Sequence, residues 1–264
     1  MPSLNHEIEI TFVLAAVEPM AVLARLETAN RLADFSLRHR APEDLRDVYL
    51  DLPERRLRQR GYALRVRHLG DRWLLCLKGR SRHRGIAVQR LELEGDPTDP
   101  ELRTRIRDEL GNDWPAALAP TNAAMGDRSA GPLPALQSAG FSPIQDRRTL
   151  RRPRDVLGIG NEALAVLAID TVIYVVEGTP FRHHEVEIEA AMRTDDSTMD
   201  DIARALAATC PELQPWRPSK LATGLALEAL VRHQRTLPIT DSEGNLLPQS
   251  YSLLLEWLRP HHNE

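Results

Sequence analysis

Alternation of polar and apolar positions is clearest between Gly61 and Gly95. In three segments of this stretch charged side chains fall on one face at period two and the positions between them are apolar, which predicts three successive β-strands. The charged set is Arg65, Arg67, Lys78, Arg90, Glu92 and Glu94, and the apolar set is Leu64, Val66, Leu75, Leu77, Leu91 and Leu93. In an ordinary half-exposed sheet the charged face would be solvated. Several consecutive strands of this kind instead favour a barrel with a charged interior and with helices over its apolar outer face.

The residues before this stretch predict a further strand and short helices. Residues 6–14 begin with strict alternation, with Glu7, Glu9 and Thr11 on one face, and this period predicts a strand. Pro19 suits the first turn of a helix. The other elements predicted in this half are a helix over 20–32, a short strand over 46–51, a basic helix over 53–60 and a helix over 100–110.

The second half opens with a segment of low periodicity. Residues 112–140 are rich in Ala, Pro, Gly, Ser and Asn, which predicts a linker or a flexible insertion. The elements predicted after it are a basic strand over 141–152, a turn at Gly158 and Gly160, two apolar strands joined near Asp170, a strand over 181–190, a helix over 198–209 and a helix from Ser219 to about His233. The polar tail contains one apolar patch, 253–258, which predicts either a docked helix or a contact for a partner.

Charge and cysteine content narrow the class of protein. The 264 residues include 34 basic and 38 acidic ones, and this near balance argues against a dedicated nucleic-acid binder. Cys76 and Cys210 fit no disulfide framework and no zinc spacing, so we expect a reducing compartment, the cytoplasm. The sequence has no run of about eighteen apolar residues and no N-terminal basic-then-apolar signal, so we expect a soluble protein without membrane contact.

Basic and acidic strands recur in both halves of the sequence. The basic pairs are Arg65 with Arg67 and Arg147 with Arg151, and the acidic pairs are Glu92 with Glu94 and Glu185 with Glu187. Arginine forks match phosphate oxygens, and carboxylates supply the oxygen ligands that Mg²⁺ and Mn²⁺ prefer. The inventory therefore suits a polyanion held by Arg and Lys and bridged by a divalent metal to carboxylates. Such a metal also offers a route to hydrolysis, by orienting a water and neutralising phosphoryl charge.

The same positions carry a resemblance to a known family. The motifs are Glu7-Ile8-Glu9-Ile10-Thr11, Val48-Tyr49-Leu50-Asp51, Leu64-Arg65-Val66-Arg67, Lys78-Gly79, Arg90-Leu91-Glu92-Leu93-Glu94, Asp170, Glu185-Val186-Glu187 and Ser219-Lys220. In this order, over about residues 6–230, the chain resembles the CYTH superfamily of triphosphate tunnel metalloenzymes. That superfamily includes inorganic triphosphatases, thiamine triphosphatase and class IV adenylate cyclases.

The resemblance implies an α+β fold, an eight-stranded antiparallel β-barrel with helices packed outside, over residues 1–232, followed by a tail over 233–264. It implies a site for Mg²⁺ or Mn²⁺ made by Glu7, Glu9, Asp170, Glu185 and Glu187. It implies phosphate binding by Arg65, Arg67, Lys78, Arg90, Arg147 and Lys220. Direct catalytic roles fall to Glu7, Glu9, Arg65, Lys78 and Lys220.

The implied activity is metal-dependent hydrolysis of inorganic triphosphate or of an organic or nucleoside triphosphate. Two alternatives stay open, a class IV type adenylate cyclase and a non-catalytic polyphosphate or nucleotide sensor. Thr11 favours the second, because it replaces the lysine of the family's entry motif and so removes a cation from the site. Gln145 likewise stands where a second basic residue might precede Arg147. The partner implied is a triphosphate-containing small molecule, and the oligomeric state, with a homodimer as one option, is left open.

Other catalytic signatures are missing from the sequence. There is no P-loop, and Gly158-Ile159-Gly160 lacks the third glycine of a dinucleotide site. The neighbouring His183 and His184 suggest a zinc site less than they suggest side chains that face solvent or stack on neighbours.

Overall fold

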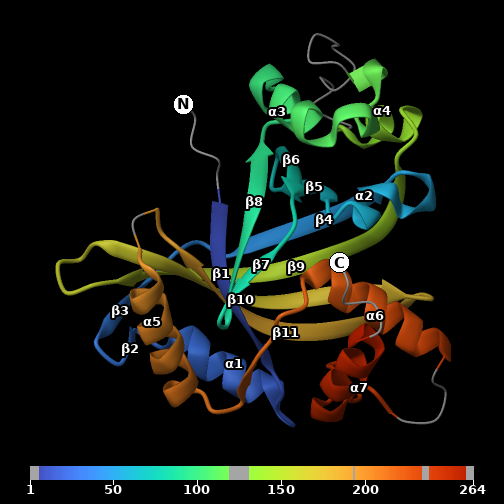
Figure 1. Cartoon of the computed structure of the whole chain (residues 1–264). Helices are drawn as coiled ribbons and strands as arrows, with labels where there is room; N and C mark the ends of the chain where they lie inside the picture. The colour runs from blue at the N-terminus through green and yellow to red at the C-terminus, as the bar shows by residue number, and fades with distance from the viewer. Residues whose placement is uncertain (1–5, 119–130, 193, 234–237, 260–264) are drawn as a thin grey trace.

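Eight antiparallel strands close into a barrel (Figure 1). The computed structural model describes residues 6–118, 131–192, 194–233 and 238–259. The strand order is β10-β11-β1-β8-β6-β5-β4-β9, and pairing of β9 with β10 closes the ring. The strands are β1 (His6–Leu14), β4 (Glu43–Asp51), β5 (Ala63–Leu69), β6 (Arg72–Lys78), β8 (Ala87–Gly95), β9 (Ser142–Leu157), β10 (Ala163–Val176) and β11 (Thr179–Ala190). The predicted barrel is therefore confirmed.

Short strands extend the wall of the barrel at its margins. β3 (Phe35–His39) pairs with the end of β9, and β2 (Arg31–Leu32) pairs with β3. β7 (Arg82–Arg84) forms a hairpin with β8, and β12 (Leu213–Pro215) pairs with β1. The helix predicted over 20–32 ends earlier, at Thr28, because the residues that follow join this extension of the sheet.

Helices surround the barrel. They are α1 (Pro19–Thr28), α2 (Arg56–Gln59), α3 (Pro100–Leu110), α4 (Leu133–Ser138), α5 (Asp196–Thr209), α6 (Lys220–His233) and α7 (Pro248–Leu258), with 3-10 turns η1 (Pro53–Arg55), η2 (Gly111–Asp113) and η3 (Ala116–Leu118). The helix predicted from Ser219 is confirmed, and Ser219 Oγ accepts a hydrogen bond from Ala222 N at 3.2 Å, as an N-cap does.

One predicted break in the chain is wrong. β10 continues through Asp170 as a single strand, although the sequence predicted two strands joined near this residue. A lone carboxylate in an apolar run resembles a turn, because a buried charge is costly without partners. Arg151 and Lys220 supply those partners here, at 2.7 and 3.2 Å.

The apolar core lies mostly outside the barrel, in three clusters. One cluster is formed under α1 and α5, and a second under α3 and α4. The third lies under α6 and α7. Because successive side chains of a strand point to opposite faces, the apolar residues that face these helices leave the charged residues on the inside of the barrel. The hydropathy pattern of the sequence thus fixes which face is turned inward.

Helix α6 closes one end of the barrel. Val172 and Tyr174 continue the inward face of β10 beyond Asp170, and they pack with α6. A Cβ on Gly224 of α6 would lie 2.5 Å from the Tyr174 ring and 2.3 Å from the amide nitrogen of Gln145. Glycine is required at this close approach, and the approach brings Lys220, the first residue of α6, to the barrel interior.

The tail forms a docked helix, the first of the two structures predicted for it. Helix α7 lies beside α6 (Figure 1). Its residues Tyr251, Leu254 and Leu258 are buried in the cluster shared with α6. The division of the chain at 232 and 233 into a domain and a tail stays a prediction.

The flanks of the segment 112–140 belong to the core. Trp114, Leu118 and Leu136 are buried with residues of α3, and Trp114 Nε1 donates a hydrogen bond to Leu118 O at 3.1 Å. The low periodicity of this segment did not predict these contacts. Its centre, residues 119–130, lies outside the described residues, so the predicted flexibility of the insertion is not addressed there.

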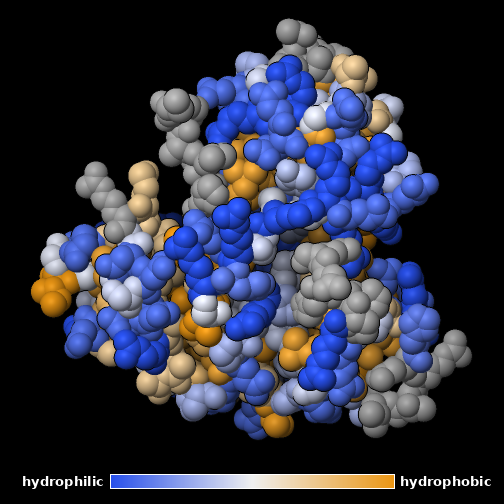
Figure 2. Space-filling model, viewed as in Figure 1, coloured by the Kyte–Doolittle hydropathy of each residue, from blue (hydrophilic) through white to orange (hydrophobic). Residues whose placement is uncertain are grey.

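The visible face of the molecule is mainly hydrophilic, with apolar residues in small groups (Figure 2). Within the described ranges, none of the helices combines the length and the apolar character needed to cross a membrane.

His184 is expected to make the fold sensitive to acid. Burial lowers the pKa of its ring to about 4, although a hydrogen bond with Asn245 opposes this shift. The unfolded chain, with a histidine pKa near 6.5, binds the proton more tightly, so the stabilising effect is complete above pH 6.5 and is lost as the pH falls toward 4. Between pH 7 and pH 4.5 the free energy of unfolding of the parent should fall by roughly 2–3 kcal/mol more than that of His184→Gln, as measured by urea unfolding. Equal losses in both proteins would contradict this assignment.

Candidate active site in the barrel interior

A cavity of about 1100 Å³ lies inside the barrel. The inward faces of β1, β5, β6, β8, β9 and β11 contribute charged side chains to its lining, and Lys220 adds one from α6. These lining residues are Glu7, Glu9, Arg65, Arg67, Lys78, Arg90, Glu92, Glu94, Arg147, Arg151, Glu185, Glu187, Glu189 and Lys220. The residues predicted to bind phosphate and all but one of those predicted to bind metal therefore face one space. The exception, Asp170, is fully buried in the wall behind it.

Three of the five predicted metal ligands form one group. Asp170 on β10 and Glu185 and Glu187 on β11 each place a carboxylate oxygen within 4.8 Å of the others. The ammonium of Lys220 contacts all three, at 3.2 Å from Asp170 and 2.6 Å from Glu187, with Glu185 also in contact. Burial alone would raise the pKa of Glu187, but Lys220 and Arg151 outweigh it and hold the pKa well below its usual range. We call Asp170, Glu185 and Glu187 the three-carboxylate group.

Arg151 also contacts this group, a role that the sequence did not predict. Its guanidinium forms two hydrogen bonds to Asp170, at 2.9 and 2.7 Å, and one to Glu187 at 2.7 Å. Thr11 on β1 lies opposite Glu187 in the strand register. Arg151 therefore supplies a cation beside the position where Thr11 lacks the expected lysine.

Glu7 and Glu9, the other two predicted metal ligands, pair with cations on β6 and β8. Lys78 lies 3.0 Å from Glu7, and Arg90 lies 3.2 Å from Glu7 and 2.7 Å from Glu9. Burial raises the pKa of Glu9 to about 7 against the attraction of Arg90, and the charges of Glu7 and Glu187 contribute to the rise. Glu9 is thus electrostatically linked to the three-carboxylate group, but its oxygens are held by Arg90.

Asp47 organises the basic part of the wall. It is 1 % exposed and lies 2.8 Å from Arg67, 3.2 Å from Arg147 and 3.6 Å from Arg65. Burial alone would raise the pKa of the Asp47 carboxyl, but the three arginines outweigh this effect and hold the pKa well below its usual range. Arg147 also donates to Tyr49 Oη at 3.0 Å and lies over the tyrosine ring. Three of the predicted phosphate-binding arginines are thus gathered around one carboxylate.

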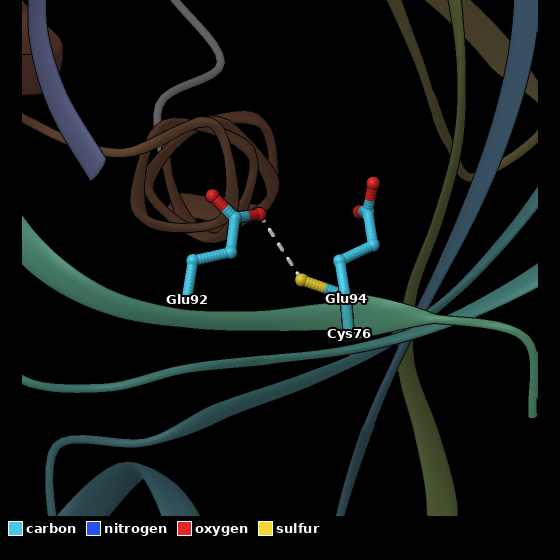
Figure 3. Close-up of side chains that lie close together, drawn as sticks. All are labelled: Cys76, Glu92 and Glu94. Carbon is cyan, nitrogen blue, oxygen red and sulfur yellow. Dashed lines mark hydrogen bonds between the residues drawn. The ribbon is translucent and has the colours of Figure 1, made fainter. Parts of the chain in front are cut away.

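A second group of potential ligands, Cys76, Glu92 and Glu94, lies on the wall formed by β6 and β8 (Figure 3). The Cys76 thiol donates to Glu92 at 3.2 Å, and Arg65 binds Glu94 at 2.7 Å. Burial raises the pKa of Cys76 to about 12. A thiol must lose its proton to bind a metal, so this group is a poor metal site at neutral pH, and its carboxylates orient Arg65 and Lys78 instead.

The three-carboxylate group fits a hard divalent cation better. Its donors are oxygens only, and they converge, which is the ligand chemistry of Mg²⁺ and Mn²⁺. In the structure the Lys220 ammonium lies among these oxygens and offsets part of their negative charge. Binding of a divalent cation would therefore release Lys220 and Arg151 from part of their contacts with the carboxylates, which makes these cations available to an anion.

The two neighbouring histidines do not share a site. His183 points inward to Glu185 at 2.8 Å, whereas His184 points outward to Thr171 and Asn245. Both are fully buried, so of the two predicted alternatives exposure to solvent is wrong, whereas His183 packs against neighbouring aromatic rings, as the other alternative predicted. A zinc site that uses both rings is excluded by their opposite directions.

Family membership follows from comparison with known proteins. Residues 5–225 match the model of the CYTH domain. The chain belongs to the CYTH family. The predicted membership is thereby confirmed, and no curated protein matches the chain significantly.

Several solved structures are similar to the chain at low sequence identity. An adenylyl cyclase candidate from Hippeastrum, described as having a dominant triphosphatase activity, is 16 % identical, with 87 % of this chain and 100 % of that chain covered and a TM-score of 0.57. A protein from Pyrococcus horikoshii OT3 is 18 % identical, with 86 % and 99 % covered and a TM-score of 0.47. An adenylate cyclase candidate from Bacillus halodurans is 16 % identical, with 87 % and 97 % covered and a TM-score of 0.47.

Proposed function

We propose that this CYTH protein hydrolyses a triphosphate, inorganic or organic, in a metal-dependent reaction inside its barrel. The observation that carries the proposal is the charge balance of the interior. The strands and α6 turn seven cations into the described interior, and each has a carboxylate within 3.2 Å; they are Arg65, Arg67, Lys78, Arg90, Arg147, Arg151 and Lys220. The carboxylates outnumber these seven cations, since they are Glu7, Glu9, Asp47, Glu92, Glu94, Asp170, Glu185, Glu187 and Glu189.

This balance argues for a metal in addition to an anionic substrate. A triphosphate that enters such an interior alone meets cations that are already paired with carboxylates. Positive charge from one or two divalent cations would compensate the carboxylates, so that the arginines and lysines can turn to phosphate oxygens. The three-carboxylate group in particular favours a bound cation, because its like charges otherwise repel one another.

The residues divide the work as follows. Asp170, Glu185 and Glu187, with Glu7 and Glu9 beside them, would hold Mg²⁺ or Mn²⁺. When bound, the metal would supply charge neutralisation and a polarised water for attack on phosphorus. The cations that would grip and orient the phosphates are Arg65, Arg67, Lys78, Arg90, Arg147 and Lys220. Positioning of this kind accounts for most of the catalysis of phosphoryl transfer.

Although Thr11 replaces a lysine, the site still has a cation at this point, and its presence favours an enzyme over a sensor. Arg151 lies 2.7 Å from Glu187, the residue opposite Thr11, and carries a permanent positive charge. We therefore expect Thr11→Lys to change the rate little, because a second cation at this point repels Arg151.

The test is release of phosphate and pyrophosphate from inorganic triphosphate, ATP and thiamine triphosphate, with Mg²⁺, with Mn²⁺ and with EDTA. We expect phosphate release that needs a divalent metal, and the best substrate then names the enzyme. Turnover unaffected by EDTA would contradict the metal requirement. Pyrophosphate from ATP without free phosphate would indicate a cyclase. Tight binding of triphosphate without turnover, restored by Thr11→Lys, would indicate a sensor.

The remaining assignments are part of the same proposal. The partner would be a triphosphate-containing small molecule, with no role for nucleic acid. A cytoplasmic location and the option of a homodimer stay predictions.

A further inference from the structure

His183 lies directly behind the three-carboxylate group. It stands two residues before Glu185 on the inward face of β11, and its ring is fully buried. His183 Nε2 lies 2.8 Å from Glu185 Oε2, while Glu185 Oε1 contacts Lys220. One oxygen of Glu185 is thus held from behind, and the other contacts Lys220, which also contacts Asp170 and Glu187.

The tautomer of His183 follows from its surroundings. The rings of Tyr174, Trp216 and Tyr251 enclose it, with centroids 6.4, 6.3 and 5.6 Å away. His183 Nδ1 is buried, and within the described part of the chain it has no hydrogen-bond partner. A proton on Nδ1 would find no acceptor, and a buried donor without an acceptor is costly. The proton therefore lies on Nε2 and is donated to Glu185.

We propose that His183 is a positioning residue that fixes the Glu185 carboxylate for a divalent cation. The inference rests on the proposed function and extends it to a residue that touches neither metal nor substrate. A hydrogen bond to the rear oxygen selects one orientation of the carboxylate and limits its rotation, as outer partners of metal ligands generally do. The enclosing rings lock the imidazole in turn. One of them, Tyr251, belongs to α7, so the C-terminal helix takes part in shaping the site.

The structure offers a matched control in the next residue. His184 is equally buried but points to the outside of the barrel, where it bonds Thr171 and Asn245. A substitution there disturbs the same strand without touching Glu185.

The first experiment is a Mn²⁺ titration followed by the electron paramagnetic resonance signal of the free ion, with no substrate present. His183→Phe, which keeps a ring but has no donor, should weaken Mn²⁺ binding by about 10- to 100-fold. His183→Gln, whose amide donates from a similar position, should restore most of the affinity, and His184→Gln should bind as the parent does. Circular dichroism of each variant establishes that it is folded.

The second experiment needs no variant. In the ¹⁵N-histidine-labelled parent, His183 should show a protonated Nε2 and a bare Nδ1, and addition of Mg²⁺ should shift the Nε2–H resonance. Folded His183→Phe that binds Mn²⁺ as tightly as the parent, or a proton on Nδ1, would overturn the positioning role and leave the proposed function standing. A parent that binds no Mn²⁺ would overturn both.

Discussion

Glu187→Gln is expected to lower the turnover of the best triphosphate substrate by about a hundredfold or more. Glu187 contributes an oxygen to the three-carboxylate group and lies 2.7 Å from Arg151 and 2.6 Å from Lys220. Loss of this oxygen ligand weakens metal binding. A bound metal stabilises the charge of the transition state by several kcal/mol, and each 1.36 kcal/mol changes the rate about tenfold. The measurement is kcat and KM over a range of Mg²⁺ concentrations. The Mg²⁺ concentration that gives half-maximal turnover should be higher for the variant than for the parent.

Glu189→Gln is the control for this change. Glu189 follows on the same face of β11 and lines the same cavity. Burial raises its pKa to about 7, with the charge of Glu7 adding to the effect, so part of its population is already neutral near pH 7. Glutamine imitates that neutral form, and we expect less than roughly a tenfold loss of rate. Equal losses in the two variants would show that general disturbance of β11, not loss of a metal ligand, lowers the rate.

Asp47→Asn is expected to lower the free energy of unfolding by about 3–5 kcal/mol, the usual cost of removing one partner from a buried ion pair. Asp47 is 1 % exposed, and the change leaves Arg65, Arg67 and Arg147 close together without their shared counter-charge. Urea unfolding in a buffer without phosphate or sulfate measures this loss. The same arginines would then be open to an anion, so inorganic triphosphate should stabilise the variant more than it stabilises the parent.

Asp44→Asn is the matched control on the same strand. Asp44 faces outward and pairs with Arg148 with about half of each side chain exposed, and such pairs contribute up to about 1 kcal/mol. A small effect of Asp47→Asn, similar to that of Asp44→Asn, would show that the interior is hydrated well enough to compensate the arginines.

Alternation in the sequence predicts most of the barrel, because one face of each strand is apolar and the other charged. This alternation predicts the strand positions of Arg65, Lys78 and Arg90, and in the structure all three side chains line one cavity. The same alternation carries Glu185 and Glu187 to a common face. A period of two does not predict which side chains of different strands meet inside the barrel, because that depends on strand order and register.

Three features of the site therefore lay beyond the pattern. In the sequence Asp47 is one of several charged residues on a short strand. Its position between Arg67 and Arg147 follows only from the register of β4 with β5 and β9. Arg151 lies opposite Asp170 because β9 and β10 close the ring. For His183 the sequence left exposure to solvent and stacking on neighbours both open, because its enclosure depends partly on α7, more than sixty residues later in the chain.

The position of β1 bears on how the protein acquires its fold during synthesis. The first strand lies between β8 and β11, and Glu9 pairs with Glu189, which is translated roughly 180 residues later, so this seam joins distant parts of the chain. Until Ala190 has left the ribosome, β1 has an unpaired side, and the carboxylates of β1 and β11 are apart. Folding should therefore be slow, with the acidic half of the cavity completed last and the nascent barrel open to chaperones along that seam.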